Sequence, residues 1–215
     1  MLTPDPGSRT MDCYDVLYWL GDTFKPGSYL EIGVREGASL CCVLAKEKEM
    51  IDLVKSTIVE GKVQLDDDLI ERICEAYTVR EPSPECYLFD NWSYEGGENG
   101  EWRIKKLLAL FGSTEMSYRV FTGDSKETIP EFLSRAPENW KADLIYVDGD
   151  HSPEGAIADL ENVHGHFKVL VCHDLVHPDH PYLLDIWKSY TKKHDLPNFT
   201  VGLNFLGVGV AFDLG

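Results

Sequence analysis

The sequence predicts a doubly wound α/β fold built on a mostly parallel sheet of seven strands. Five short apolar segments of strand length alternate with segments whose apolar residues recur at helical spacing. Such alternation is typical of right-handed crossovers between parallel strands, with helices on both faces of the sheet. The chain ends in two strand-like segments only a few residues apart, which predicts a closing antiparallel hairpin.

The first part of the chain is predicted to contain a helical segment, one strand and a helical insertion. Apolar residues recur at helical spacing from Met11 to Leu20, and the turn Lys25-Pro26-Gly27 ends that helix. A charged stretch of helical character ends at Pro82 and Pro84. The expected units are the N-terminal segment 1–27, the strand 28–32, the helix 38–45 and the insertion 47–83.

The rest of the chain keeps a regular alternation of strand and helix. We find no internal repeat, and the length suits one domain over 1–215 with a sizeable core. Strands are predicted at 86–89, 118–121, 143–147 and 169–172, helices at 102–111, 126–133, 154–163 and 182–194, and hairpin strands at 199–203 and 208–212.

Composition excludes several classes of protein. A net charge of -17 would repel nucleic acid and anionic membranes, so neither is expected as a partner. The six cysteines show no Cys-x-x-Cys spacing, which argues against a zinc knuckle or a disulfide framework. With no apolar run of membrane length and no signal peptide, a cytoplasmic protein is expected. Assembly into a homo-oligomer is left open.

Residues that follow the strands are the candidates for ligand binding, because ligands bind beyond the carboxyl ends of parallel strands. The segment Glu31 to Gly37 combines glycines that let a ligand approach the backbone with a helix start that binds anions. Asp90, followed by Asn91, stands where an acid can accept hydrogen bonds from ribose hydroxyls. Asp124 and Ser125 follow the third strand and could bind an amine or cap a helix. Plain turns and solvated side chains are the simpler explanations.

The ends of the fourth and fifth strands carry the strongest signal. The fourth leads into Asp148-Gly149-Asp150-His151 and the fifth into His173-Asp174. Neighbouring strand ends lie about 5 Å apart, so Asp148 and Asp174 could converge on one hard cation. His151 is a candidate base for a substrate hydroxyl. Helix capping by Asp150 or Ser152 is the structural alternative. The other histidines are predicted to be scattered on the surface: His164, His166, His177, His180 and His194.

Together these residues resemble those of class I S-adenosylmethionine-dependent methyltransferases, with Glu31-x-Gly33-x-x-x-Gly37 as first motif and Asp90 as ribose acid. More narrowly, the segment 147–152 followed by His173-Asp174 resembles the small-molecule O-methyltransferase branch that includes cephalosporin hydroxylase-like proteins. The resemblance covers about residues 28–213. It implies a Rossmann-like fold and methyl transfer from S-adenosylmethionine to a hydroxyl of a sugar or secondary metabolite.

The resemblance also implies roles for residues. The first motif would hold the methionine end of the cofactor, the second-strand acid the ribose, and the third-strand end the adenine. The cofactor-binding residues so implied are Glu31, Gly33, Gly37, Ser39, Asp90, Asn91, Asp124, Ser125 and Asp148.

Catalysis and metal binding are implied for the last two strand ends. Asp148 and His151 would act on the hydroxyl, and Asp148, His173 and Asp174 would bind a divalent metal ion, if one takes part. Relatives that use a metal usually carry two consecutive acids after the fifth strand, and here His173 replaces the first. That shifts the expected ion from Mg²⁺ toward Mn²⁺ or Zn²⁺.

Two other functions stay open. A metal-dependent nucleotide-sugar glycosyltransferase would use Asp148-x-Asp150 but leaves the Glu31 to Gly37 motif unexplained. A non-catalytic module could keep the cofactor pocket without turnover. The insertion at 47–83 is a further departure from the family pattern, and it could form a lid or a dimer surface.

Overall fold

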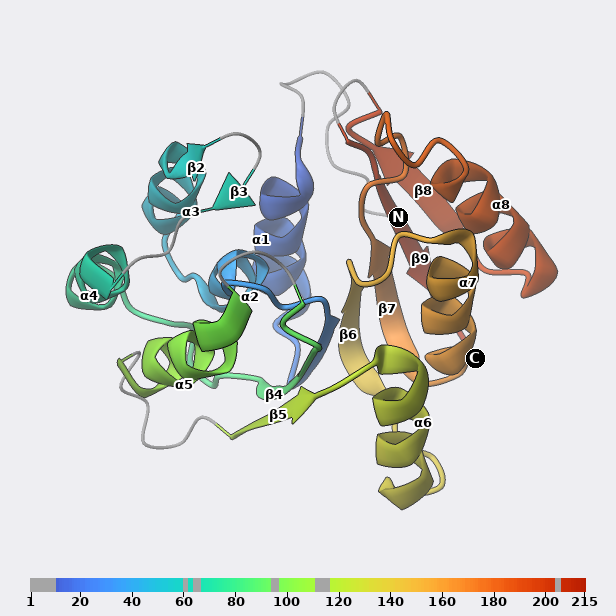
Figure 1. Ribbon diagram of the computed structural model, residues 1–215, viewed down its shortest axis with the longest axis horizontal. Coiled ribbons are helices and arrows are strands. Elements are labelled where there is room, and N and C mark those ends of the chain that lie inside the picture. The colour runs from blue at the N-terminus through green and yellow to red at the C-terminus, as the bar shows by residue number, and fades with distance from the viewer. Residues whose placement is uncertain (1–10, 60–61, 64–66, 94–96, 111–116, 204–205) are drawn as a thin grey trace.

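The computed structural model describes residues 11–215 apart from 60–61, 64–66, 94–96, 111–116 and 204–205 (Figure 1). A seven-stranded sheet has the order β5-β4-β1-β6-β7-β9-β8, and only the pairs that involve β9 are antiparallel. The predicted Rossmann-like sheet with a C-terminal hairpin is therefore confirmed. Its strands are β1 Ser28–Ile32, β4 Glu85–Asp90, β5 Tyr118–Thr122, β6 Ala142–Val147, β7 Phe167–Cys172, β8 Asn198–Val201 and β9 Val208–Phe212.

Helices cover both faces of the sheet and bury two separate cores (Figure 1). Side chains of β1 alternate between them, with Tyr29 in the first core and Leu30 and Ile32 in the second. The first core takes α1 Cys13–Phe24, α2 Ala38–Leu44, α3 Lys48–Ser56, α4 Asp67–Ala76 and α5 Gly100–Leu110. The second takes α6 Ser125–Arg135, α7 Pro153–Asn162 and α8 Leu183–Lys193. None of the described helices is long and apolar enough to cross a membrane.

The insertion differs from the helical prediction at its centre. Between α3 and α4 the chain forms a two-stranded antiparallel hairpin, β2 Ile58–Val59 with β3 Lys62–Val63. The β-branched residues here favour strand over helix, a signal that the charged pattern around them obscures. Apolar residues of α3 and α4 belong to the first core, and Lys55 forms ion pairs with Asp12 and Asp15 at the start of α1. The insertion is thus packed onto the domain.

Capping side chains and a glycine determine where two helices begin and where the strand β8 ends. Asp124 caps α6 by accepting from the Lys126 amide, and Ser152 caps α7 by accepting from the Gly155 amide. The predicted strand 199–203 ends earlier, at Val201, because Gly202 has a φ of 66° that leaves the extended region.

Candidate functional site

A cleft of about 370 Å³ lies over the carboxyl ends of the central strands. The register pairs Ile32 of β1 with Phe89 of β4 and with Val147 of β6, so the residues that follow these strands stand at one level. Most of the predicted cofactor-binding residues line this cleft, together with His151. They are Gly33, Asp90, Asn91, Asp124, Ser125 and Asp148.

Gly33 allows the tips of β1 and β6 to approach each other closely. Its φ is 85°, and a Cβ there would lie 2.0 Å from the carbonyl oxygen of Asp148. The Asp148 amide donates to the carbonyl of Ile32 at 2.9 Å, which continues the strand pairing into the turn. Glycine is therefore required to hold Asp148 beside the first motif.

Asp90 is fixed by two backbone amides. Its carboxylate accepts from the N–H of Arg35 at 2.7 Å and from the N–H of Trp92 at 2.6 Å. Both donor residues have left-handed backbone angles, with φ values of 49° and 55°, although neither is glycine. Strain of this kind costs on the order of 1 kcal/mol per residue and persists where surrounding structure imposes it. Each carboxylate oxygen keeps a lone pair for another donor.

The third strand end is tied to a buried acid that sequence reasoning missed. The Ser125 hydroxyl donates to Asp159 Oδ1 at 2.6 Å, and Asp159 of α7 is fully buried behind Gly149. Burial raises the pKa of Asp159 to about 6. A sequence signal for its burial existed, because Asp159 lies at helical spacing from Ala156 and next to Leu160, two apolar residues that are buried on the same helix. On the cleft rim, Lys126 pairs with Asp124 and Asp150.

Three predicted cofactor residues lie outside the cleft lining. Glu31 is fully buried and accepts hydrogen bonds from the hydroxyls of Tyr29 and Ser39. Burial raises the pKa of Glu31 to about 8, although these two hydrogen bonds oppose the change. Gly37 begins α2 with a φ of 82°, and a Cβ there would come 2.6 Å from the Ile104 side chain of α5. Packing within the fold thus accounts for their residue types, and their cofactor roles stay predictions.

Two carboxylates and two imidazoles meet beside the cleft. His151 Nε2 lies 3.1 Å from Asp148 Oδ1 and 3.5 Å from Asp174 Oδ2. His173 Nδ1 lies 3.3 Å from Asp148 Oδ2 and 3.3 Å from Asp174 Oδ1. Asp148, His151 and Asp174 each offer a ligand atom within 4.8 Å of the others. Of the three predicted metal residues, this group contains Asp148 and Asp174 but has His151 in place of His173; their metal-binding roles stay predictions.

Burial and the charges of neighbouring side chains shift the pKa values of the residues in this four-residue cluster. Burial raises the pKa of Asp148, but the neighbouring His173 and His151 outweigh it and hold that pKa well below the usual range. Burial lowers the pKa of His151, but the hydrogen bond and charge of Asp148 raise it above the ordinary value. The pKa of Asp174 is raised by burial. Perturbed groups in a cleft are typical of functional sites.

Four of the five remaining histidines lie in pairs rather than being scattered, and His166 stands apart from them. The His180 ring lies near that of His151, with centroids 5.2 Å apart and planes tilted by 57°, and the His177 ring centroid lies 5.1 Å from that of His180. The Tyr182 hydroxyl donates to the His151 carbonyl at 3.0 Å and also contacts His180 Nδ1. The loop after β7 is thereby joined to the loop after β6. Away from the cleft lining, His164 and His194 stack with ring centroids 3.6 Å apart, and His166 Nδ1 contacts the Trp140 carbonyl oxygen instead.

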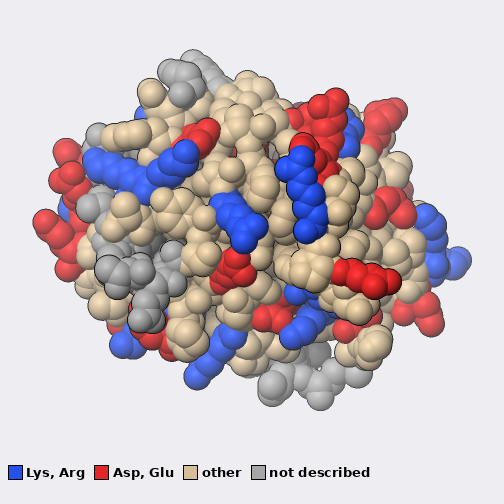
Figure 2. All heavy atoms as spheres, turned by 90° about the horizontal axis from the view of Figure 1, so that it is seen from below, with Lys and Arg blue, Asp and Glu red and all other residues tan. Residues whose placement is uncertain are grey.

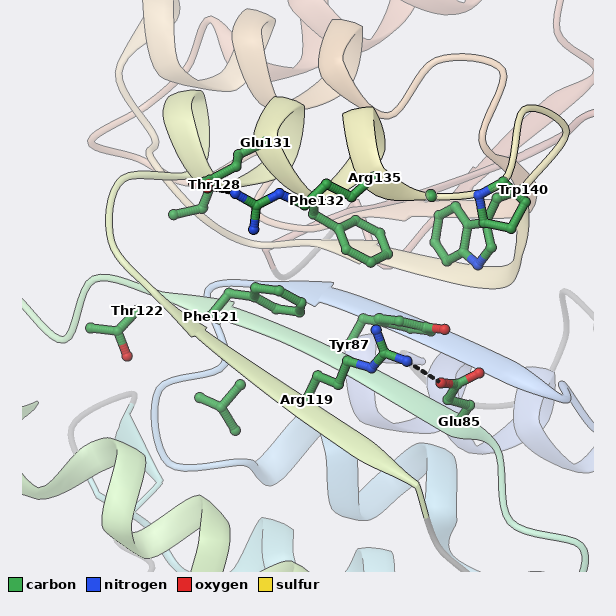
Figure 3. Close-up of a pocket in the computed structure, with 13 residues that line it drawn as sticks. Glu85, Tyr87, Arg119, Phe121, Thr122, Thr128, Glu131, Phe132, Arg135 and Trp140 are labelled. Carbon is green, nitrogen blue, oxygen red and sulfur yellow. Dashed lines mark hydrogen bonds and ion pairs between the residues drawn. The ribbon is translucent and has the colours of Figure 1, made fainter.

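A larger groove of about 790 Å³ lies at the sheet edge, between β5 and α6 (Figure 3). Helix α6 follows the edge strand β5 and packs over β4, and Phe121 of β5 lies against Phe132 of α6 with ring centroids 5.3 Å apart. Aromatic rings of Tyr87, Phe132 and Trp140 pack together with centroids 5.0 to 5.2 Å apart, and Arg119 pairs with Glu85 at the rim (Figure 3). The groove contains none of the predicted site residues.

Figure 2 shows basic side chains standing among acidic and uncharged ones on the face it presents. The exclusion of nucleic acid as a partner rests on the net charge of -17 and stays a prediction.

Solved structures share this fold at low sequence identity. CalS11, a TDP-rhamnose 3'-O-methyltransferase of calicheamicin biosynthesis, is 19% identical with a TM-score of 0.58, over 94% of this chain and 78% of that chain. TomG, an O-methyltransferase of tomaymycin synthesis from Streptomyces achromogenes, was solved with S-adenosylmethionine. It is 16% identical with a TM-score of 0.57, over 99% of this chain and 83% of that chain. An O-methyltransferase from Bacillus cereus, solved with S-adenosylhomocysteine, is 13% identical with a TM-score of 0.58, over 98% and 84%.

No curated protein matches the sequence significantly. A family model described as a methyltransferase domain matches residues 30–175, which run from within β1 to the residue after His173-Asp174. This match covers well over half of the chain and contains the whole cleft lining. The chain therefore belongs to the methyltransferase domain family.

Proposed function

We propose that this protein transfers a methyl group from S-adenosylmethionine to a hydroxyl of a small molecule, such as a sugar or a secondary metabolite. The observation that carries the proposal is the single cleft that brings Gly33, Asp90 and Asp124 together with Asp148 and His151. The names of CalS11 and TomG, two O-methyltransferases with the same fold, support the reaction class.

The cleft residues fit the cofactor. Because Gly33 has no side chain, a ligand can approach its backbone, whereas a Cβ at this position would collide with the residue that follows β6. Asp90 presents a carboxylate that two amides hold in place, so its free lone pairs are oriented before ribose hydroxyls arrive. Asp124 and Ser125 line the far end, where an exocyclic amine would find an acceptor. When bound, S-adenosylmethionine supplies a methyl group on a positively charged sulfur.

Asp148 and His151 are the groups placed to act on the acceptor. In-line displacement at the methyl carbon requires the hydroxyl to be aligned at near-contact distance and to lose its proton. Asp148 holds His151 at 3.1 Å and so orients the imidazole toward the cleft that both line. In its neutral form His151 can accept the hydroxyl proton, with Asp148 stabilising the imidazolium that forms.

A divalent metal ion also fits the cluster. Asp174 is buried, and its Oδ1 makes no hydrogen bond among the described residues and has only the ion pair with His173 Nδ1 at 3.3 Å. A buried, unsatisfied carboxylate oxygen is costly unless a cation or donor satisfies it. Asp148 and Asp174 would hold the ion, which would lower the pKa of the acceptor hydroxyl and fix its position.

Calorimetry with S-adenosylhomocysteine tests the cofactor half of the proposal. Wild type should bind, and Asp90→Ala should bind at least about tenfold more weakly, because one good hydrogen bond to a charged group contributes about 1.5 to 3 kcal/mol. Asp22→Ala, an exposed acid on α1, is the matched control. Wild type that fails to bind at millimolar concentration would contradict the proposal.

Methyl transfer to a panel of hydroxyl compounds, including TDP-rhamnose and catechols, tests the reaction half. Incorporation of labelled methyl into an acceptor supports it. Cofactor binding without transfer to any of them would favour the non-catalytic module. The glycosyltransferase alternative is not favoured, because the chain belongs to the methyltransferase domain family. Manganese-dependent binding of a nucleotide sugar without cofactor binding would revive it.

A further inference from the structure

We infer that Asp159, a buried acid of α7, determines which kind of purine the cleft accepts. By holding the hydroxyl hydrogen of Ser125, it makes that side chain a hydrogen-bond acceptor toward the cleft. An acceptor suits a purine with an exocyclic amine and opposes one with an oxygen in its place. Asp159 is a positioning residue that acts through Ser125. The inference rests on the proposed function, because it concerns the ligand of the same cleft.

Asp159 lies directly behind two residues that line the cleft. The residue is 0% exposed, and its helix α7 packs beside α6 (Figure 1). Its Oδ1 accepts from the Ser125 hydroxyl at 2.6 Å, and its Oδ2 lies 2.6 Å from the position that a Cβ on Gly149 would take. Ser125 follows β5 and Gly149 follows β6, and both line the cleft. The buried carboxylate therefore lies against two strand ends that face the ligand.

The hydrogen bond to Asp159 fixes where the hydrogen of the Ser125 hydroxyl points. An ionised carboxylate can only accept, so the hydroxyl must be the donor of this bond. Burial raises the pKa of Asp159 to about 6, which still leaves the acid mainly ionised at about pH 7.5. A hydroxyl has one hydrogen and two lone pairs. With its hydrogen on Asp159, Ser125 has only lone pairs left for a ligand in the cleft.

Ser125 is the better shielded of the two acceptors at this end of the cleft. The neighbouring Asp124 has an exposed side chain, its Oδ1 accepts from the Lys126 amide at 2.9 Å, and its Oδ2 lies 3.5 Å from Lys126 Nζ. Water and Lys126 therefore compete with a ligand for Asp124. An exocyclic amine can donate to Ser125 Oγ, whereas an oxygen at the same place would set lone pair against lone pair. Unmatched acceptors of this kind discriminate strongly between analogues.

Packing alone does not account for an acid at position 159. Its Oδ2 has no hydrogen-bond partner in the described part of the chain. A buried carboxylate oxygen without a partner costs free energy, and the raised pKa shows that the surroundings oppose the charge. Ala156 and Leu160 are buried on the same helix, so this face of α7 accommodates apolar side chains. The hydrogen bond to Ser125 is what the acid provides and an apolar residue could not.

Calorimetry at about pH 7.5 with two ligands tests the inference. The ligands are S-adenosylhomocysteine and S-inosylhomocysteine, in which an oxygen replaces the exocyclic amine. Wild type should prefer the amine ligand by at least about fivefold, as expected for one unmatched acceptor. In Asp159→Ala the Ser125 hydroxyl is free to donate to the oxygen, so the ratio of the two dissociation constants should fall at least about threefold. A ratio in Asp159→Ala as large as that of wild type would overturn the inference.

A double-mutant cycle shows whether Asp159 acts through Ser125. Ser125→Ala should lose the preference by itself, and adding Asp159→Ala to it should leave the ratio unchanged. A merely structural role for Asp159 would weaken both ligands alike and would not move the ratio. Glu154→Gln, at an exposed acid in the first turn of α7, is the matched control and should keep the wild-type ratio. A further fall in the double variant would contradict the route through Ser125.

The same titrations separate this inference from the proposed function. If circular dichroism shows that Asp159→Ala does not fold, Ser125→Ala carries the test, and a wild-type ratio in that variant would refute the inference. Wild type that binds S-adenosylhomocysteine with a ratio insensitive to Asp159→Ala removes only this inference. Wild type that binds neither ligand at millimolar concentration removes the proposed function, and the inference with it.

Discussion

Replacing Glu31 with Gln should make the protein more stable at alkaline pH. Glu31 lies fully buried between Tyr29 and Ser39, beneath the first motif. Gln has nearly the same shape, can accept from the Tyr29 hydroxyl and can donate to the Ser39 oxygen. The substitution therefore removes the ionisable group while keeping volume and hydrogen bonding.

The expected change in the free energy of unfolding follows from the pKa of the buried Glu31 carboxyl. Burial raises it from 4.5 to about 8. Each pKa unit corresponds to about 1.4 kcal/mol, so ionised Glu31 destabilises the fold by roughly 5 kcal/mol above pH 8. Between these two values the folded protein holds a proton that the unfolded chain has released. Stability from this group is therefore complete below pH 4.5 and is lost as the pH rises to 8.

Urea unfolding followed by circular dichroism at pH 5, 6, 7, 8 and 9 measures this effect. The free energy of unfolding of Glu31→Gln minus that of wild type should rise by about 1.4 kcal/mol per pH unit at its steepest and level off above pH 8. Glu131→Gln, at an exposed acid of α6, is the control and should give a nearly constant difference. Parallel curves for Glu31→Gln and wild type would refute the burial argument.

The other predictions concern the cleft and its supports. Asp159→Asn should remove a similar pH dependence in a lower window, from about pH 4 to 6, because burial raises the pKa of Asp159 to about 6; urea titrations would show no such difference if Asp159 ionises freely. Gly33→Ala should destabilise the fold by at least about 2 kcal/mol and abolish S-adenosylhomocysteine binding, since its Cβ would overlap the Asp148 carbonyl; a wild-type melting temperature would contradict this. Tyr182→Phe should cost about 1 kcal/mol through loss of one hydrogen bond, with cofactor affinity retained; weaker cofactor binding would show that the loop acts on the cleft.

The sheet could be predicted because its signals are local and repeated. Each inner strand is a short apolar run bounded by turn residues, and the close spacing of the last two strands required a hairpin. In a parallel sheet the carboxyl ends of the strands lie along one edge. Gly33, Asp90 and Asp148, which follow three of these strands, could therefore be expected in one cleft. The hairpin of the insertion was missed because two-residue strands leave almost no periodicity.

Side-chain partners could not be read from the sequence in the same way. Glu31 belongs to the first motif and Ser39 follows it in α2, yet the Ser39 hydroxyl donates to the Glu31 carboxylate outside the cleft lining, which depends on how α2 packs on β1. The approach of His180 to His151 depends on the path of the loop after β7, which has no regular spacing. Asp159 reaches Ser125 only because α6 and α7 lie side by side on the sheet.

A crystal structure of the protein with S-adenosylhomocysteine tests the central claim most directly. We predict that the ligand occupies the cleft over β1, β4 and β6, with both ribose hydroxyls on the carboxylate of Asp90. Ligand density confined to the edge groove between β5 and α6, with Asp90 still bound only by its two amides, would contradict the claim.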